Sequence, residues 1–133
     1  LLGAFERIVG FELVLSRGTP FRFDGLRALE QAYGRQVFPV VEPGGTHVRL
    51  INKSDAPMAA TVKAYGADGL LLGTYPVALA KNAKADVDVT AAIPTDGVMA
   101  WLLVEGNNIF TAHAFIETSD GKRLVTYAGV PLY

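Results

Sequence analysis

A strand, a turn and a second strand follow one another in the stretch Ile109-Phe-Thr-Ala-His-Ala-Phe-Ile-Glu-Thr118, Ser119-Asp-Gly-Lys122, Arg123-Leu-Val-Thr-Tyr-Ala-Gly-Val130. Both flanks are rich in β-branched and aromatic residues, which are the residues that strands favour. The Asp-Gly between them supplies the backbone conformations that a tight turn requires. This stretch therefore predicts a C-terminal β-hairpin.

The beginning of the chain carries a similar pattern in Ile8-Val-Gly-Phe-Glu-Leu-Val-Leu-Ser16, Arg17-Gly-Thr-Pro20 and Phe21-Arg-Phe-Asp-Gly-Leu26. With a gap of one residue, the two copies align Gly18 with Gly121, Phe23 with Tyr127, Gly25 with Gly129 and Leu26 with Val130. The same unit at both ends is expected of a window cut from a repeat array. It is equally expected of a subunit that lends a hairpin to its neighbour.

Length, charge and composition exclude several classes of protein. The 133 residues carry 12 basic and 13 acidic side chains without a block of like charge, which is unlike a nucleic-acid binder or a polybasic membrane anchor. Apolar residues come in short runs, so we expect no membrane span of about 20 residues. The absence of cysteine excludes disulfides and thiolate metal sites, but it does not settle the compartment. The chain also starts without Met and without a recognisable signal peptide, which suggests processing or a piece of something longer.

Between the two hairpins the sequence reads as short strands separated by turns. Residues 46–52 and 60–65 alternate apolar and polar side chains, as half-buried antiparallel strands do. Turn signals recur about every 8–12 residues, which is typical of an antiparallel sandwich, although a barrel would give a similar string. We therefore expect an all-β, Ig-like β-sandwich over residues 35–133, preceded by a hairpin and connector over residues 1–34.

Four local features refine this prediction. Asp24–Tyr33 has helical spacing and could form one short helix within residues 24–34, although an irregular connector fits equally well. Pro39 confines its strand to a sheet edge or a bulge, because proline cannot donate to a ladder. Gly106-Asn-Asn108 reads as a turn, and Trp101, in the most apolar stretch, is expected at the centre of the core.

The sequence offers little chemistry for an enzyme. His113 could be a general base, but nothing nearby supplies a nucleophile and an orienting group, and His47 is no better placed. Asp86 and Asp88 share a face without the spacing of a calcium loop. We therefore expect no catalytic residue, no cofactor and no metal ligand, and a protein that is not an enzyme.

Tyr65 is the best candidate for a ligand contact. It lies on the polar face of its predicted strand, where an aromatic ring could stack on a sugar. A carbohydrate-binding module, with a glycan as its partner, is therefore an alternative reading of the chain.

Several segments together resemble the tandem Ig-like β-sandwich repeats of large secreted bacterial surface and filament proteins. They are Val37-Phe-Pro-Val-Val41, Val48-Arg-Leu-Ile-Asn52, Ala64-Tyr-Gly-Ala-Asp-Gly-Leu-Leu-Leu72, Trp101-Leu-Leu-Val-Glu105 and Gly129-Val-Pro-Leu-Tyr133. The resemblance covers roughly residues 8–133 and departs at Asp24–Gly34, which is inserted between hairpin and strand. It implies a structural role outside the cell or on the bacterial cell surface, and it carries no catalytic residues.

Our hypothesis from the sequence is a non-enzymatic structural or assembly module that contacts identical subunits or adjacent repeats by β-strand addition. In this hypothesis the N-terminal hairpin is donated to a neighbouring subunit or repeat, because it matches the C-terminal hairpin that closes the domain. The residues expected at this assembly interface are Val9, Phe11, Leu13, Leu15 and Pro39.

Overall fold

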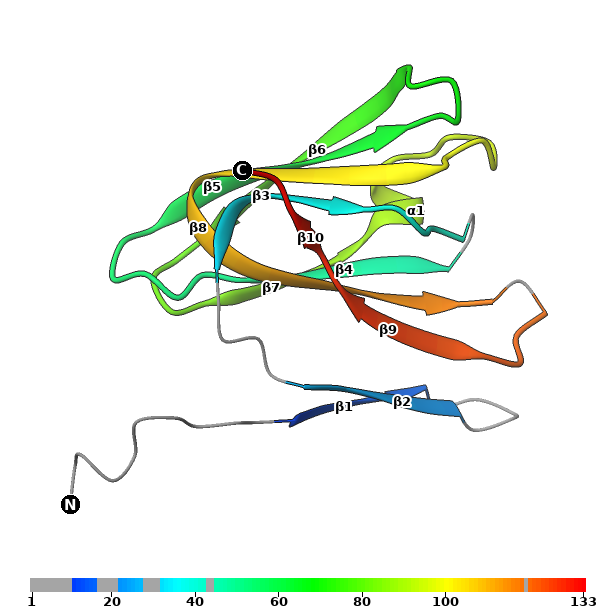
Figure 1. The fold of residues 1–133 in the computed structure, drawn as a ribbon, viewed down its shortest axis with the longest axis horizontal. Coiled ribbons are helices and arrows are strands. Elements are labelled where there is room, and N and C mark those ends of the chain that lie inside the picture. The colour runs from blue at the N-terminus through cyan, green and yellow to red at the C-terminus, as the bar shows by residue number, and fades with distance from the viewer. Residues whose placement is uncertain (1–10, 17–21, 28–31, 43–44, 119) are drawn as a thin grey trace.

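The computed structural model describes residues 11–16, 22–27, 32–42, 45–118 and 120–133, and it confirms an all-β antiparallel sandwich (Figure 1). One layer, the β5 sheet, has the strand order β10-β3-β8-β5-β6, and the other, the β4 sheet, has the order β9-β8-β4-β7. The strands are β3 (Tyr33–Phe38), β4 (Thr46–Ile51), β5 (Met58–Tyr65), β6 (Leu71–Leu79), β7 (Lys84–Asp88), β8 (Trp101–Glu117), β9 (Leu124–Ala128) and β10 (Val130–Pro131).

Strand β8 belongs to both sheets, because its first part pairs with β3 and β5 and its second part with β4 and β9. The turn predicted at Gly106-Asn-Asn108 is therefore wrong, since the strand bends there and continues. Gly106 makes the bend possible, because a Cβ at this position would lie 2.8 Å from the Cε of Met58 and 3.0 Å from the Cδ1 of Phe110. The side chain of Asn107 accepts a hydrogen bond of 3.0 Å from the backbone N–H of Ala59, which keeps the bend bonded to β5.

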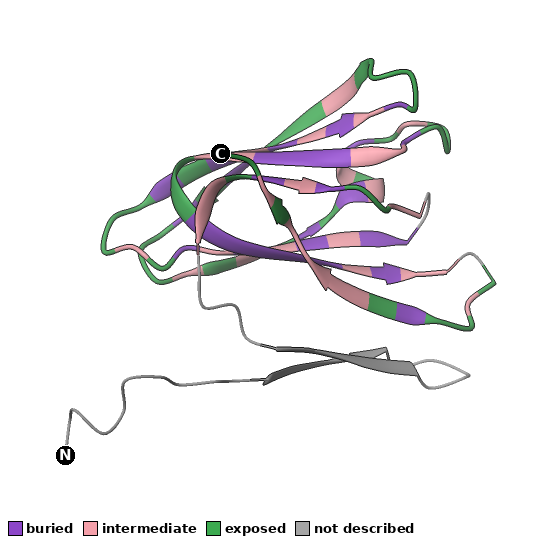
Figure 2. Ribbon diagram, in the orientation of Figure 1, coloured by how far each residue is buried: buried purple, intermediate pink, exposed green. Residues whose placement is uncertain are grey.

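The core lies between the sheets, where Figure 2 shows the buried segments of β4, β5 and β8 facing one another. The alternation predicted for residues 46–52 and 60–65 is confirmed, since every second side chain of β4 and β5 is buried. The central apolar residues are Val48, Leu50, Ala60, Val62, Ala64, Leu102, Val104, Phe110, Ala112 and Ala114. Burying each large aliphatic or aromatic side chain contributes about 1.5–3 kcal/mol, so this layer holds the two sheets together.

The helix expected within residues 24–34 is not formed in the described part of that segment. Arg22–Arg27 is strand β2 and Tyr33–Phe38 is strand β3, because both segments find antiparallel partners and pairing overrides the local helical spacing. The helix that the described residues do contain is α1 (Val89–Ala92), which begins where the carboxylate of Asp88 accepts a 3.1 Å hydrogen bond from the N–H of Ala91. Among the described residues, no helix is long and apolar enough to cross a membrane.

Pro39 lies directly after β3, which ends at Phe38, so its missing N–H removes no bond from a described ladder. The strand that precedes it is not the outermost strand of its sheet, because β10 pairs with β3 at Gln36 and Val37. The proline therefore marks the end of a strand.

The predicted N-terminal hairpin is confirmed as the pair β1 (Phe11–Ser16) and β2 (Arg22–Arg27), which form their own two-stranded sheet. Strand β2 extends to Arg27, beyond the end expected from the sequence. In Figure 1 the hairpin lies on the side of the β4 sheet that faces away from the β5 sheet, with β2 next to β9. Val9, one of the residues expected at the assembly interface, lies outside the described residues.

Candidate interaction surfaces

Part of the outer face of the β4 sheet is buried, although its side chains point away from the core. Because Ala112 and Ala114 face inward, Thr111 and His113 must face outward, yet each is only 2% exposed. Leu124 of β9 lies on the same face and is 9% exposed. A sheet face that meets water leaves such side chains accessible, so this part of the face, around β8 and β9, is shielded from solvent. The β1–β2 hairpin is the described element on this side of the molecule.

A charged and aromatic cluster lies on this outer face of the β4 sheet. The guanidinium of Arg49 forms a two-point ion pair with the carboxylate of Asp86, in which Nη2 donates to Oδ2 at 2.9 Å. The same guanidinium lies 5.7 Å from the ring centre of Phe115, and His47 stacks on that ring at 4.9 Å. The ion pair holds the pKa of Asp86 below its usual range. The cluster therefore joins β4, β7 and β8 across the sheet.

His113 lies in the buried part of this face, and its surroundings keep it neutral. Burial and, to a smaller extent, the positive charge of Arg49 lower its pKa to about 4, while Asp86 acts in the opposite direction. A general base must reach the proton that it removes from a substrate. A side chain that is 2% exposed gives a substrate no access, so the geometry favours a packing role for His113.

The outer face of the β5 sheet carries a second charged cluster, built around Glu105 of β8. Arg35 of β3 donates from Nε to its carboxylate at 2.9 Å, and Lys63 of β5 donates to the other carboxylate oxygen. Both cations lower the pKa of Glu105, with Lys63 contributing most. Leu103, which faces outward in the same region, is only 7% exposed. The three long side chains thus lie across a small apolar area outside the main core.

Tyr65 and Trp101 stack on each other at one end of the β5 sheet. Their ring centres are 4.1 Å apart and their planes differ by 5°. The expectation that Trp101 forms the core centre is wrong, because Leu102 and Val104 face inward and the strand period turns Trp101 outward, where it is half-buried. The outward position expected for Tyr65 is confirmed.

The stacked pair belongs to a row of apolar residues that crosses the sheet. Tyr65 pairs with Trp101 on one side and with Leu71 of β6 on the other. The register of β3 with β8 places Pro39, the residue after Phe38, opposite Trp101. We call Pro39, Trp101, Tyr65 and Leu71 the aromatic row. Leu71 is 52% exposed, and Leu70, which precedes it, and Val98, which precedes β8 in the chain, are 64% and 60% exposed, so the row carries apolar side chains that meet solvent.

The sequence identified Tyr65 but not its partner. Tyr65 and Trp101 are far apart in the chain, and only the register of β5 with β8 brings them together. Strand alternation places Trp101 on the same face as Glu105, which indicates an outward side chain. The apolar residues on either side of Trp101 made this pattern hard to recognise in the sequence. The two clusters around Arg49 and Glu105 were missed for the same reason, since each joins residues from three strands.

Comparisons with known proteins support the fold but give no information about the candidate surfaces. No protein-family model matches the chain, and no curated protein matches it. The crystal structure of Thermotoga maritima 1070 is similar, with a TM-score of 0.62, 12% sequence identity, and coverage of 77% of this chain and 97% of that one. At this identity the similarity supports the all-β sandwich alone.

Proposed function

We propose that this chain is a non-enzymatic structural module that self-associates through its N-terminal hairpin. The observation that carries the proposal is the position of the β1–β2 hairpin. Within the described residues it pairs only with itself, yet it lies next to β9 on the outer face of the β4 sheet. The hairpin is thus a separate element of the fold that contacts the sandwich without belonging to either of its sheets.

Such a hairpin needs a surface to be stable. An isolated two-stranded hairpin is marginally stable in water, and it gains stability when an apolar face is packed against another layer. In the sequence, apolar residues recur at every second position of β1, namely Phe11, Leu13 and Leu15. This pattern is typical of a strand that packs one side against another layer.

The same hairpin can serve a neighbouring copy in place of its own sandwich. Among the strands described, β9 forms a ladder only with β8, and β2 lies beside it without pairing, so β9 keeps an edge for strand addition. A copy that exchanges its hairpin with a neighbour would reuse the position of β2 beside β9 and add a ladder to it. When the exchange runs from each copy to the next, it is head-to-tail and propagates instead of closing.

The setting of the module is also part of the proposal. The resemblance to tandem Ig-like repeats of secreted bacterial surface and filament proteins supports a location outside the cell or at its surface. In that setting the partners would be identical subunits or adjacent repeats, and the module would use no cofactor.

The test is the mass of the protein in solution with and without the hairpin. We expect the full chain to form open oligomers whose mass rises with concentration in light scattering. Deleting residues 1–31 should leave a sandwich with the same core and no propagating assembly. Leu13→Glu in the full chain, which interrupts the apolar pattern of β1, should have the same effect without shortening the protein. If both variants assemble as the full chain does, the proposal is wrong.

The alternative is a carbohydrate-binding module that uses Tyr65. In its favour, Tyr65 lies beside a second aromatic ring and near the charged groups of Lys63 and Glu105. Sugar rings stack on ring faces that point outward, however, and Tyr65 and Trp101 turn one face of each ring toward the other. Binding of a glycan array by the wild type, lost in Tyr65→Ala, would favour this alternative over assembly.

A further inference from the structure

We propose that the outer face of the β5 sheet is a second contact surface, on which two copies of this chain pack face to face about a twofold axis at the aromatic row. This surface lies on the layer opposite the hairpin. The inference is therefore independent of the strand exchange proposed above.

The composition of the aromatic row is that of a protein contact. Trp and Tyr are among the residue types that most often dominate binding energy in interfaces, and here the exposed Leu71 lies beside them. Single exposed apolar residues are common on any surface, but the exposed Leu71 pairs directly with Tyr65 of the stacked pair, and Leu70 precedes it in the chain. An apolar area of this kind gains stability when a partner removes it from water.

The orientation of the two rings selects the kind of partner. Parallel rings with centres 4.1 Å apart on neighbouring strands stand upright on the sheet, with their edges toward solvent. Upright rings can insert between the side chains of a facing protein surface, whereas a sugar needs a ring face. The partner is therefore a protein surface with apolar side chains.

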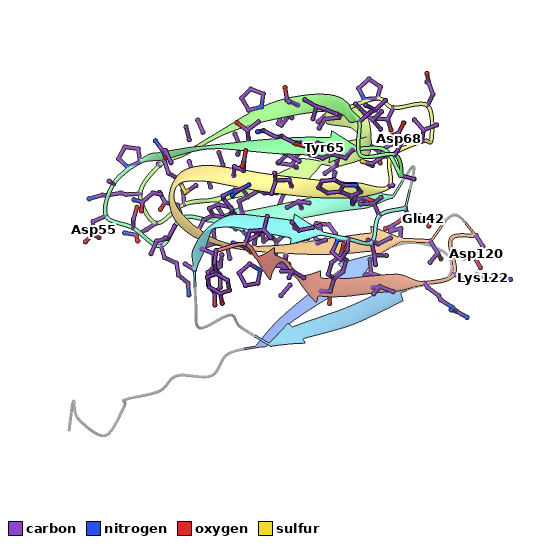
Figure 3. All side chains as sticks on the ribbon, turned by 45° about the horizontal axis from the view of Figure 1, so that its top comes forward. Glu42, Asp55, Tyr65, Asp68, Asp120 and Lys122 are labelled. Carbon is purple, nitrogen blue, oxygen red and sulfur yellow. The ribbon has the colours of Figure 1, made fainter. Side chains whose placement is uncertain are left out.

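The charges around the row select a second copy of the chain. Lys63 lies on one side of the row, two residues before Tyr65 on β5. Lys63 and Arg35 together carry two positive charges against the one negative charge of Glu105, so this side is basic. On the other side lies the turn after β5, which carries the exposed carboxylate of Asp68, labelled beyond Tyr65 in Figure 3. Asp68 accepts a hydrogen bond from the N–H of Leu70, which fixes its place in the turn.

A twofold axis at the row exchanges these two sides. It brings the basic side of one copy opposite the acidic side of the other, and it does so twice in each dimer. The apolar rows then meet at the centre, and the charges form a polar rim, as in typical protein interfaces. The face is thus complementary to itself in both charge and polarity, which is the condition for an isologous contact.

The first test measures the mass of the full chain and of Leu71→Glu by light scattering over a range of concentrations. Leu71 is exposed, so the substitution should leave the fold intact, which circular dichroism checks. We expect Leu71→Glu to lower the mass of the assembled protein by about half at each concentration, because the twofold contact no longer joins two copies. Ile109→Glu is the matched control, because Ile109 is 53% exposed at the bend of β8, away from the row, and should leave the mass unchanged. An unchanged mass for Leu71→Glu, or a wild-type chain that is monomeric throughout, overturns the inference.

The second test exchanges the charges. Asp68→Lys should weaken the dimer about tenfold, because it places a cation opposite Arg35 and Lys63 of the other copy. Adding Arg35→Glu should restore the dimer, since the two changes reverse both sides of the contact. A double variant that stays as weak as Asp68→Lys overturns the antiparallel arrangement. The hairpin variant Leu13→Glu separates the two proposals, because it should abolish propagation while the dimer remains.

Discussion

At the scale of single residues, His113 makes the stability of the fold depend on pH. Burial lowers its pKa to about 4 in the folded chain, whereas an unfolded histidine titrates near 6.5. The part of the unfolding free energy that depends on a neutral His113 is thus fully present above pH 6.5. It is lost as the pH falls toward 4, because the histidine binds a proton more tightly in the unfolded chain than in the folded one. We expect a loss of about 3 kcal/mol in unfolding free energy between pH 7 and pH 4.

Urea unfolding at a series of pH values measures this dependence, and His113→Gln provides the comparison. The variant should be less stable at pH 7 but should lose much less stability between pH 7 and pH 4. Asp86 and Glu105 also have lowered pKa values, so their contributions fade only at lower pH than that of the histidine. Parallel pH profiles for wild type and variant would show that His113 is not the group responsible.

Tyr127 of β9 ties the two sheets together beside the core. Its hydroxyl donates to the backbone carbonyl of Val40, after β3, and accepts from the N–H of the same residue at 3.2 Å. Its ring packs on Phe38 with ring centres 5.9 Å apart. Tyr127→Phe keeps the ring and removes the hydrogen bonds, so we expect a loss of about 1 kcal/mol in unfolding free energy. Tyr75→Phe, at an exposed position, is the control, and an equal loss in both variants would contradict the assignment.

At the scale of elements, the bend of β8 depends on the absence of a side chain at Gly106. A Cβ there would lie 3.0 Å from the carbonyl oxygen of Asn108 as well as close to Met58 and Phe110. We expect Gly106→Ala to cost about 1–3 kcal/mol in unfolding free energy, because the bend must open or the core must shift. Gly34→Ala is the control, since a Cβ there would have ordinary contacts at 3.9 Å. Urea unfolding of both variants tests this, and a neutral Gly106→Ala would mean that the bend is held elsewhere.

The elements that the sequence predicted well are those with local signals. Alternation located β4 and β5, and the Asp-Gly turn located the end of the C-terminal hairpin, because both signals depend on neighbours in the chain. The sequence failed where a distant partner decides the structure. Gly106-Asn-Asn108 has the composition of a turn, but hydrogen bonding to β5 keeps it extended, and residues 24–27 have helical spacing but pair with β1. Trp101 and Tyr65 form a site only through the register of β8 with β5.

At the scale of the whole molecule, the two proposed contacts lie on opposite layers, and this arrangement predicts the form of the assembly. A hairpin exchanged from copy to copy makes an open chain, and a twofold contact on the β5 sheet joins two such chains side by side. Each contact can be removed by one substitution at a distance from the other, so the effects should add.

Four proteins therefore give four expected species in negative-stain microscopy and light scattering. The wild type should form paired filaments, Leu71→Glu single filaments, Leu13→Glu discrete dimers, and the double variant monomers. The dimers of Leu13→Glu are the decisive species, because they require the aromatic row to act when the hairpin does not. If Leu13→Glu were monomeric and Leu71→Glu matched the wild type, the hairpin alone would carry the assembly, and the apolar face of the β5 sheet would need another occupant.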